Sequence, residues 1–511
     1  MERNKLESGY FEFMEHKKNL MISHILKYSF AQYFSQFLGF FTSMIMKVFL
    51  GPVYVGMWGV LRVVIDYASY ANLGTGAAVS YRLPMLRGAG DEKKARELSN
   101  VVFNFVSITT FVCSVGVLIY AVLARKSMEI ELFIGLLAVS VVLLTQRVYT
   151  YYMLLLRANK DFTILSKAVI FEAIANLSLI LLIVSRFKLY GFYFVAIIMP
   201  VLNVLFIRRY ITYELKFSFD LRGIYSSIRY GIPLFLISIL NQILHSIDSL
   251  MIAGMLGFEQ LGFYSIALMA RSYGTGVSKN FIIIIQPYFL GDFNKDDVSR
   301  SSRHVGIYSQ VTAYFMTILL SIVFITAPVL IVAILPKFVP GIMAMRIFLL
   351  ATFFFTVESY PNDLLVALEK QSKLIPVVGL SIFVNILLNY MFIKQGFGIS
   401  GVAVATSISA LISFLVIAVY ALKHSETAIG IMGFFVKIAI PMVYSAAALT
   451  AVYSFISFQN LFIEALLRLI VFMCLVIPLM LYLNRETGIP SMILNMIIGK
   501  IKRKNGTKRY E

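Results

Sequence analysis

Charged and polar side chains recur inside stretches of this chain that are otherwise apolar. An ionisable group at the centre of a lipid bilayer costs ~2.5–3.5 kcal/mol, so residues of this kind usually serve a function. In the stretch 54–82, Arg62 and Asp66 stand one helical turn apart, and in the stretch 259–287, Arg271 and Lys279 follow one helical stripe. Further polar residues on such stripes are Gln36, Lys47, Asn241, His245 and Asp248. Because these stripes must face protein or water rather than lipid, we predict that they line a cleft.

Arginine in such a cleft favours an anionic ligand, because the planar guanidinium group can hold two phosphate oxygens at once. An internal repeat described below aligns Arg271 with Ile65, which lies one helical turn from Arg62. The two arginines are therefore expected at similar depths on related helices, where they would converge on a shared ligand. The predicted substrate-binding residues are Arg62, Arg271, Lys279, Lys47, His245, Gln36 and Asn241.

The acidic residues leave two interpretations open. Arg62 and Asp66 could simply neutralise each other along the helix, and Asp248 could be the counter-ion of Arg271. Alternatively, Asp66 and Asp248 could bind a coupling ion. We therefore predict that Asp66 and Asp248 serve in ion coupling or in charge pairing.

Some of the remaining polar residues have structural explanations. His245 is best explained as a packing histidine, and Lys47 lies near a helix end, where its side chain could extend to the interface. Arg147, Glu172 and Glu358 are isolated in the flanking helices. For these three residues we expect partners within their own half of the protein rather than contacts with a substrate.

No catalytic constellation is evident in the sequence. It contains no phosphate-binding loop of the GxxxxGK type, no clustered metal ligands and no nucleophile elbow. The two cysteines, Cys113 and Cys474, sit in apolar runs and are expected to be buried hydrophobic residues. We therefore expect a protein that is not an enzyme and that needs no cofactor and no metal.

The elements that must position these residues are membrane-spanning helices. Of the 511 residues, 59% are hydrophobic and 14% are charged, whereas soluble domains carry roughly 25% charged residues. Apolar stretches long enough for a bilayer occur at 24–50, 54–82, 99–124, 131–156, 164–185, 190–211, 229–256, 259–287, 305–335, 341–367, 374–394, 398–422, 431–456 and 461–483. The predicted fold class is an all-α polytopic membrane protein with about fourteen transmembrane helices.

The net charge of +19 is explained largely by topology. Basic residues concentrate in alternate loops, which the positive-inside rule places in the cytoplasm together with both termini. No cleavable signal peptide is evident, and the segment 485–511 is expected to be a basic amphipathic tail on the inner leaflet. The sequence thus predicts a multi-pass protein of a bacterial or archaeal plasma membrane, with no nucleic-acid partner.

The chain also contains an internal repeat. The glycines of the first hairpin, Gly51 and Gly56, recur as Gly257 and Gly262, and Pro84 recurs as Pro287. Because both copies would start in the cytoplasm, they are expected to be parallel six-helix lobes around a central cleft. The predicted division is an N-lobe at 1–211, a linker at 212–228, a C-lobe at 229–423, two extra helices at 424–484 and the tail.

Three segments resemble a known superfamily. They are YGIPLFLISILNQILHSIDSLMIAGMLGFEQLGFYSIA at 230–267, LGPVYVGMWGVLRVVIDYASYANLGTG at 50–76 and GFGISGVAVATSIS at 396–409. They are similar to bacterial polysaccharide flippases of the multidrug/oligosaccharidyl-lipid/polysaccharide exporter superfamily. The resemblance spans residues ~20–483, and its diffuse, glycine-based motifs identify the superfamily better than the substrate.

The resemblance implies export of a lipid-linked glycan. The expected activity is the flipping of an oligosaccharide on a polyprenyl pyrophosphate, as for O-antigen or capsule repeat units, by alternating access. The expected partners are this glycan, membrane lipid and the polymerase and glycosyltransferases of the same process. Other branches imply a lipid II-type flippase or a cation-coupled multidrug exporter. A membrane glycan polymerase or ligase is disfavoured because every predicted outer loop is short.

Overall fold

A computed structural model describes the backbone of residues 2–211, 220–292, 298–368, 370–423 and 428–487, together with Lys216 and Ser218. Side chains are described from Lys27 onward, except for residue 234, residues 277–304 and a few positions beside the remaining gaps. The side chain of Lys279 and nearly all of the predicted tail at 485–511 therefore lie outside the described residues.

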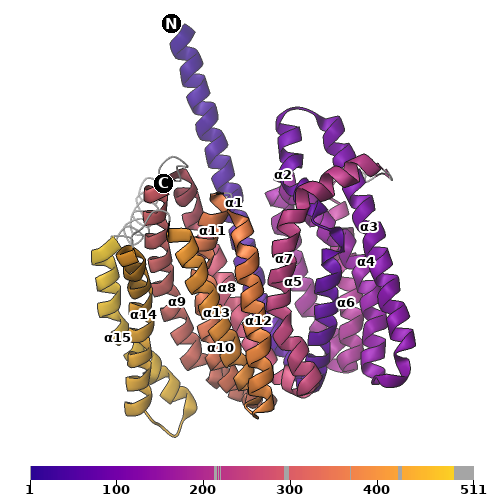
Figure 1. The fold of residues 1–511 in the computed structure, drawn as a ribbon. Coiled ribbons are helices and arrows are strands. Elements are labelled where there is room, and N and C mark those ends of the chain that lie inside the picture. The colour runs from indigo at the N-terminus through magenta and orange to yellow at the C-terminus, as the bar shows by residue number, and fades with distance from the viewer. Residues whose placement is uncertain are drawn as a thin grey trace, which may run out of the picture. The chain divides into compact units, whose positions relative to one another are not determined.

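The described chain is helical throughout and contains no strand, as the sequence predicts (Figure 1). Short 3-10 or π-helical segments join several of the α-helices. The α-helices are α1 (Glu2–Ser69), α2 (Thr75–Gly88), α3 (Glu92–Leu123), α4 (Ile130–Ala158), α5 (Phe162–Leu179), α6 (Ser185–Arg208), α7 (Leu221–Met255), α8 (Phe258–Asp292), α9 (Val298–Ile334), α10 (Ile342–Val357), α11 (Ser359–Ala367), α12 (Leu374–Lys394), α13 (Gly398–Leu422), α14 (Ala428–Phe455) and α15 (Leu461–Thr487).

Eleven helical stretches of the described residues are long and apolar enough to cross a membrane. Two of them, Lys27–Asn72 and Phe162–Arg208, each contain two of the spans expected from the sequence. A straight helix of this length would be roughly twice the thickness of the hydrocarbon core. Non-helical backbone at Gly51 and Lys188 divides the two stretches. The protein is therefore a multi-pass membrane protein, and the count of fourteen spans stays a prediction.

Local sequence signals explain where two of the helices, α3 and α7, begin. Asp91 caps α3 by accepting a hydrogen bond from the backbone N–H of Lys94 at 3.1 Å. Asp220 caps α7 by accepting from the N–H groups of Arg222 and Gly223. These carboxylates satisfy donors that have no partner within the first helical turn.

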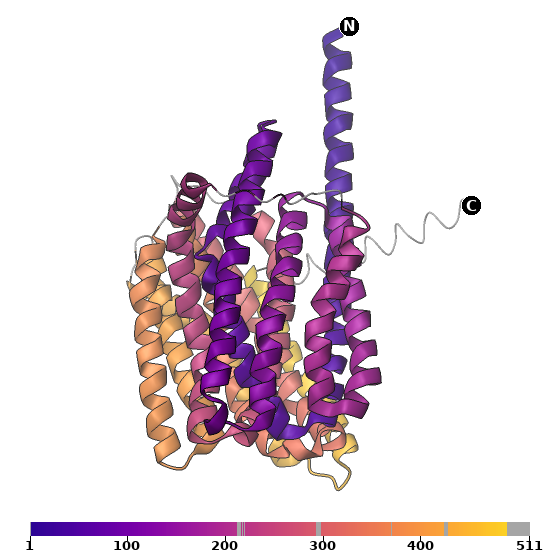
Figure 2. The same ribbon diagram turned by 90° about the vertical axis from the view of Figure 1, so that its right-hand side faces the viewer.

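Contacts group the chain into two units, Met1–Gly262 and Phe263–Glu511. In the first unit, α1 packs on α5, α4 packs on α3 and α6, and α2 packs on α7. Figures 1 and 2 show α3, α4 and α6 running side by side. Helix α7 thus packs within the first unit, whereas the predicted repeat places it at the start of the second lobe. The predicted lobe boundaries follow sequence similarity rather than packing, and they stay a prediction.

The second unit is organised around α9 and α13. Helices α10 and α12 pack on α13, while α14 and α15 pack on α9 and on each other. A cluster of buried side chains from α9, α10, α13 and α14, including Phe353 and Phe414, forms a core of this unit. The two helices that the sequence predicts outside the repeat correspond to α14 and α15.

Two glycines allow a backbone crossing inside the first unit. A Cβ atom on Gly56 would lie 1.8 Å from the carbonyl oxygen of Phe258, and one on Gly262 would lie 2.0 Å from that of Pro52. No side chain larger than hydrogen fits at such distances. The first hairpin and the start of α8 therefore touch through backbone, at two glycines that the sequence repeat pairs with each other.

Candidate functional site

Arg62 and Asp66 form an exposed charged pair on the predicted stripe of α1. The Nε atom of Arg62 donates to Oδ1 of Asp66 at 3.2 Å, and the two side chains are 60% and 38% exposed. The pairing considered from the sequence is thus present, but an exposed ion pair contributes only about 0.2–1 kcal/mol. The two Nη atoms of Arg62 form no hydrogen bond with any of the described residues. They remain available to an anionic ligand.

Arg62 also lines a cavity of about 370 Å³ inside the first unit. Its wall includes parts of α1, α4, α5 and α6 together with Ile180 of the π-helical turn between α5 and α6. The polar residues of the wall include Thr42, Ser43, Gln146, Tyr149, Glu172, Asn176 and Asn203. One guanidinium group and one carboxylate, that of Glu172, therefore share this space.

Two features of this cavity were not predicted from the sequence. The hydroxyl of Tyr149 donates to Oε2 of Glu172 at 2.6 Å. The side-chain oxygen of Asn203 is buried and has no hydrogen-bond partner in the part of the chain that the structure describes. These residues come from three different helices, and their positions along the chain do not show which helices pack against one another. Only packing brings them together with Arg62.

The isolated charges of the flanking helices do have partners within their own units. Arg147 donates to the hydroxyl of Thr110 at 2.8 Å and to the carbonyl oxygen of Ser69 at 3.2 Å. It therefore satisfies a carbonyl at the point where α1 ends. Glu358 accepts a hydrogen bond from Ser413 at 3.1 Å. Both residues therefore have partners within their own units, and their lack of contact with a substrate stays a prediction.

Other predicted cleft residues of α1 are less accessible. Lys47 is only 4% exposed, and its Nζ atom donates to the hydroxyl of Ser43 at 3.1 Å. Its side chain therefore does not extend to the interface in this structure. Gln36 is half-buried on the same helix. Of the cationic residues predicted on α1, Arg62 is thus the one that is open to solvent.

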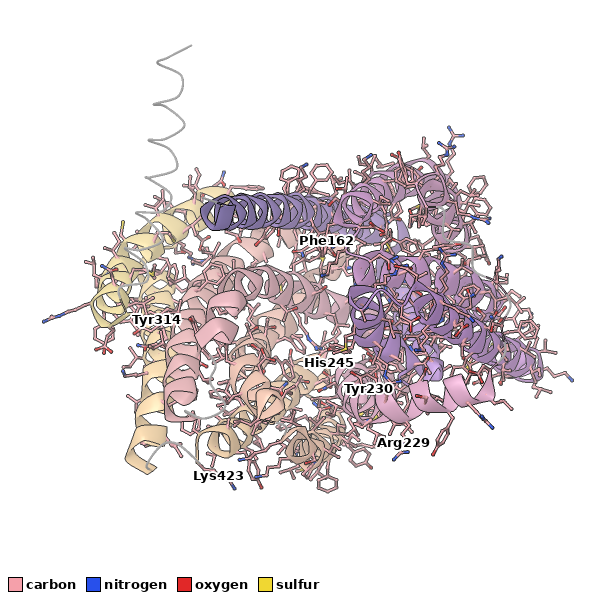
Figure 3. All side chains as sticks on the ribbon, turned by 90° about the horizontal axis from the view of Figure 1, so that it is seen from above. Phe162, Arg229, Tyr230, His245, Tyr314 and Lys423 are labelled. Carbon is pink, nitrogen blue, oxygen red and sulfur yellow. The ribbon has the colours of Figure 1, made fainter. Side chains whose placement is uncertain are left out.

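Helix α7 carries its polar stripe next to the second half of α1. The hydroxyls of Tyr67 and Ser246 lie 2.9 Å apart and join these two helices. Asp248 is buried, whereas Asn241 and His245 are half-buried. Figure 3 marks His245 on α7 together with Tyr230, whose ring lies 4.5 Å from the guanidinium carbon of Arg82.

In the second unit, Arg271 stacks on an aromatic ring. Its guanidinium carbon lies 5.1 Å from the centroid of Phe355, a favourable cation–π contact. Arg271 and Arg62 belong to different units, so their predicted convergence stays a prediction. Lys279 was also predicted on this stripe, but its side chain lies outside the described residues.

The second unit also contains a buried amide network that was not predicted from the sequence. Asn389 donates to the side-chain oxygen of Asn385 at 3.0 Å, and Asn385 donates to Thr406 and Ser409 at 3.3 and 3.2 Å. Both asparagines are fully buried. Their spacing of one helical turn on α12 was visible in the sequence, but their partners on α13 were not.

The fold is shared with solved transporters of one superfamily. The lipid II flippase MurJ in an inward closed conformation is 17% identical, covers 88% of this chain and 97% of its own, and gives a TM-score of 0.63. An inward-facing multidrug resistance MATE family transporter of the MOP superfamily is 16% identical to this chain. The match covers 80% of this chain and 95% of the transporter, with a TM-score of 0.55. A third match is a MOP superfamily transporter from Pyrococcus furiosus, which is described as having a binding pocket of reverse polarity. It is 16% identical to this chain, and the match covers 79% of this chain and 95% of the transporter, with a TM-score of 0.53.

At these identities the likeness establishes the fold alone. A search of the curated proteins found no match to the sequence. A model of the polysaccharide biosynthesis protein family, however, matches residues 22–291, more than half of the chain. This match includes the glycine crossing, the Arg62–Asp66 pair and the polar stripe of α7. The chain therefore belongs to the polysaccharide biosynthesis protein family.

Proposed function

We propose that this protein flips an oligosaccharide on a polyprenyl pyrophosphate from the cytoplasmic to the outer leaflet of a bacterial or archaeal plasma membrane. Family membership supports a role in polysaccharide synthesis, and the shared fold supports transport by alternating access. The likeness to a lipid II flippase favours a lipid-linked substrate within this superfamily. O-antigen or capsule repeat units are the proposed cargo.

The observation that carries this proposal is the state of Arg62. Its exposed guanidinium group lines a cavity and keeps both Nη atoms without a hydrogen-bond partner among the described residues. A pyrophosphate needs charged donors to offset the loss of its hydration, and a guanidinium group meets that need with paired N–H bonds. We propose that Arg271 supplies the matching group from the second unit, with Lys279, Asn241 and His245 nearby.

The proposed cycle moves the headgroup through protein while the polyprenyl tail stays in lipid. The cleft first opens to the cytoplasm and admits the glycan and pyrophosphate, and rocking of the two lobes then exposes them outside. With a negative interior, outward movement of an anion is favoured by about 2.3 kcal/mol per charge per 100 mV. Asp66 and Asp248 are the proposed sites for any coupling ion.

A second candidate function is cation-coupled export of an organic cation. The carboxylate of Glu172 lines the same cavity as Arg62, and a carboxylate is suited to a cationic ligand. The likeness to MATE family transporters supports the same alternative. The two functions differ in the charge of the cargo, so the effect of removing Arg62 separates them.

The test is flipping in proteoliposomes that contain a fluorescent polyprenyl-pyrophosphate oligosaccharide. Wild type is compared with Arg62→Ala and Arg271→Ala, and with Arg186→Ala, which removes an exposed arginine elsewhere in the chain. We expect flipping by wild type and Arg186→Ala, and a loss of at least tenfold in the first two variants. Expulsion of a cationic dye under a sodium or proton gradient, without flipping of the lipid, would establish the second candidate instead.

A further inference from the structure

The second unit contains a larger cavity that the proposed transport cycle does not use. Its volume is about 670 Å³, which falls within the range of small-molecule pockets, roughly 300–1,000 Å³. The wall is built from α9, α10 and α14 and is largely apolar, with Leu320, Leu350, Phe353, Met442 and Leu449 among its residues. Because α14 packs mainly on α9 and α15, this space separates α14 from α10.

One end of the cavity is cationic. Arg346 lines the wall, donates to the hydroxyl of Tyr453 at 2.9 Å and lies 4.5 Å from the ring centroid of Phe324. The guanidinium carbon of Arg468 lies 3.9 Å from the ring centroid of Tyr453. Two guanidinium groups therefore flank a single tyrosine ring.

The two arginines are neutralised to different degrees. Arg468 forms an ion pair with Glu464 and donates twice to the carbonyl oxygen of Ile456, at 3.2 and 2.9 Å. Arg346 has no carboxylate partner among the described residues, and its buried Nε atom has no hydrogen-bond partner. The cluster therefore carries one positive charge in excess, and that charge lies at Arg346. A buried N–H group without a partner is rare in folded proteins and calls for an explanation, of which a bound ion or ligand is one.

The positions of these residues along their helices match the two parts of a lipid. Arg346 lies about 6 Å from the start of α10, and Tyr453 lies near the end of α14. Met442, at the apolar end of the cavity, lies about 20 Å before the end of α14. The cationic end is thus at the depth of an interface, and the apolar end is near the middle of the hydrocarbon layer.

We propose that this cavity binds one anionic phospholipid, with its phosphate against Arg346 and an acyl chain between α10 and α14. Charge complementarity selects the headgroup, because Arg346 offers an unpaired N–H and an unneutralised charge at interfacial depth. The apolar wall selects a chain, since each buried methylene adds about 0.8 kcal/mol to binding. The bound lipid would join α14 and α15 to the body of the second unit.

The proposal is tested by native mass spectrometry of the full-length protein with defined lipids. Phosphatidylglycerol and phosphatidylcholine with identical chains are compared in mild detergent. We expect one phosphatidylglycerol to bind about tenfold more tightly than phosphatidylcholine, and Arg346→Gln to remove that preference. The control variant is Lys337→Gln, which removes an exposed charge from the turn at Pro336–Gly341 and should leave the preference unchanged.

A second variant fills the cavity and keeps the charge. Ala446 lines the wall, so Ala446→Trp should occupy the acyl-chain space and weaken phosphatidylglycerol binding while Arg346 is intact. Equal retention of both lipids by wild type, or displacement of the lipid by inorganic phosphate alone, would overturn the proposal. Preferential binding of undecaprenyl phosphate that phosphatidylglycerol does not displace would also overturn it, because the site would then belong to the transported carrier.

Discussion

Gly56 and Gly262 meet at a backbone crossing where neither can carry a Cβ atom. The position of a Cβ on Gly56 is 1.8 Å from the carbonyl oxygen of Phe258 and 3.0 Å from the backbone nitrogen of Gly262. These two residues also occupy equivalent places in the sequence repeat. The contact therefore joins two related hairpins of the proposed transport machinery through main-chain atoms.

Replacing either glycine should separate this crossing. In Gly56→Ala or Gly262→Ala the added methyl group has no space, and overpacking of this kind costs about 1–3 kcal/mol. We expect a lower midpoint of thermal unfolding in detergent for both variants. Gly254→Ala is the matched control, because a Cβ there meets nothing within 4 Å. Equal midpoints for Gly56→Ala and Gly254→Ala would show that the crossing relaxes without cost.

Arg147 should be a stability residue rather than a transport residue. Its hydrogen bonds reach the buried hydroxyl of Thr110 on α3 and the carbonyl oxygen of Ser69 at the end of α1. We expect Arg147→Met to destabilise the protein by about 1–3 kcal/mol, because a buried acceptor is left unpaired. The control Arg157→Met removes an exposed arginine from the same helix and should change the unfolding midpoint little. A stable Arg147→Met protein that cannot transport would contradict this assignment.

The cap of α3 predicts a dependence of stability on pH. The hydrogen bonds from the side chain and backbone of Lys94 lower the pKa of Asp91 below its ordinary value. A carboxyl group whose pKa is lower in the folded state than in the unfolded state stabilises the folded state at pH values above the unfolded-state pKa. That contribution is lost as the pH falls through the folded pKa.

The difference in unfolding midpoint between wild type and Asp91→Ala should therefore be largest near neutral pH. It should shrink below about pH 4, as the carboxyl group becomes protonated in both states. Asp91→Asn is the control, because asparagine also caps helices but does not titrate. A constant difference between wild type and Asp91→Ala from pH 7 to pH 3 would rule out the carboxylate as its source.

Much of the architecture was predictable because the bilayer constrains it so strongly. Long apolar stretches predict helices, since only internal hydrogen bonding satisfies the backbone in lipid. The spans expected around Arg147 and Glu358 are helical in the structure. The pairing of Arg62 with Asp66 was also visible in advance, because residues four apart on a helix are neighbours.

The sequence by itself determined the helical membrane fold, the polar stripes and the family resemblance, since all three depend on local spacing and composition. Tertiary structure alone decided that Lys47 is buried, that Glu172 shares a cavity with Arg62, and that Arg346 keeps an unpaired N–H beside Tyr453. The physical reason is that burial and partnership depend on which faces of distant helices meet. Helical periodicity gives the face on which a residue lies, but it does not give the helix that packs against that face.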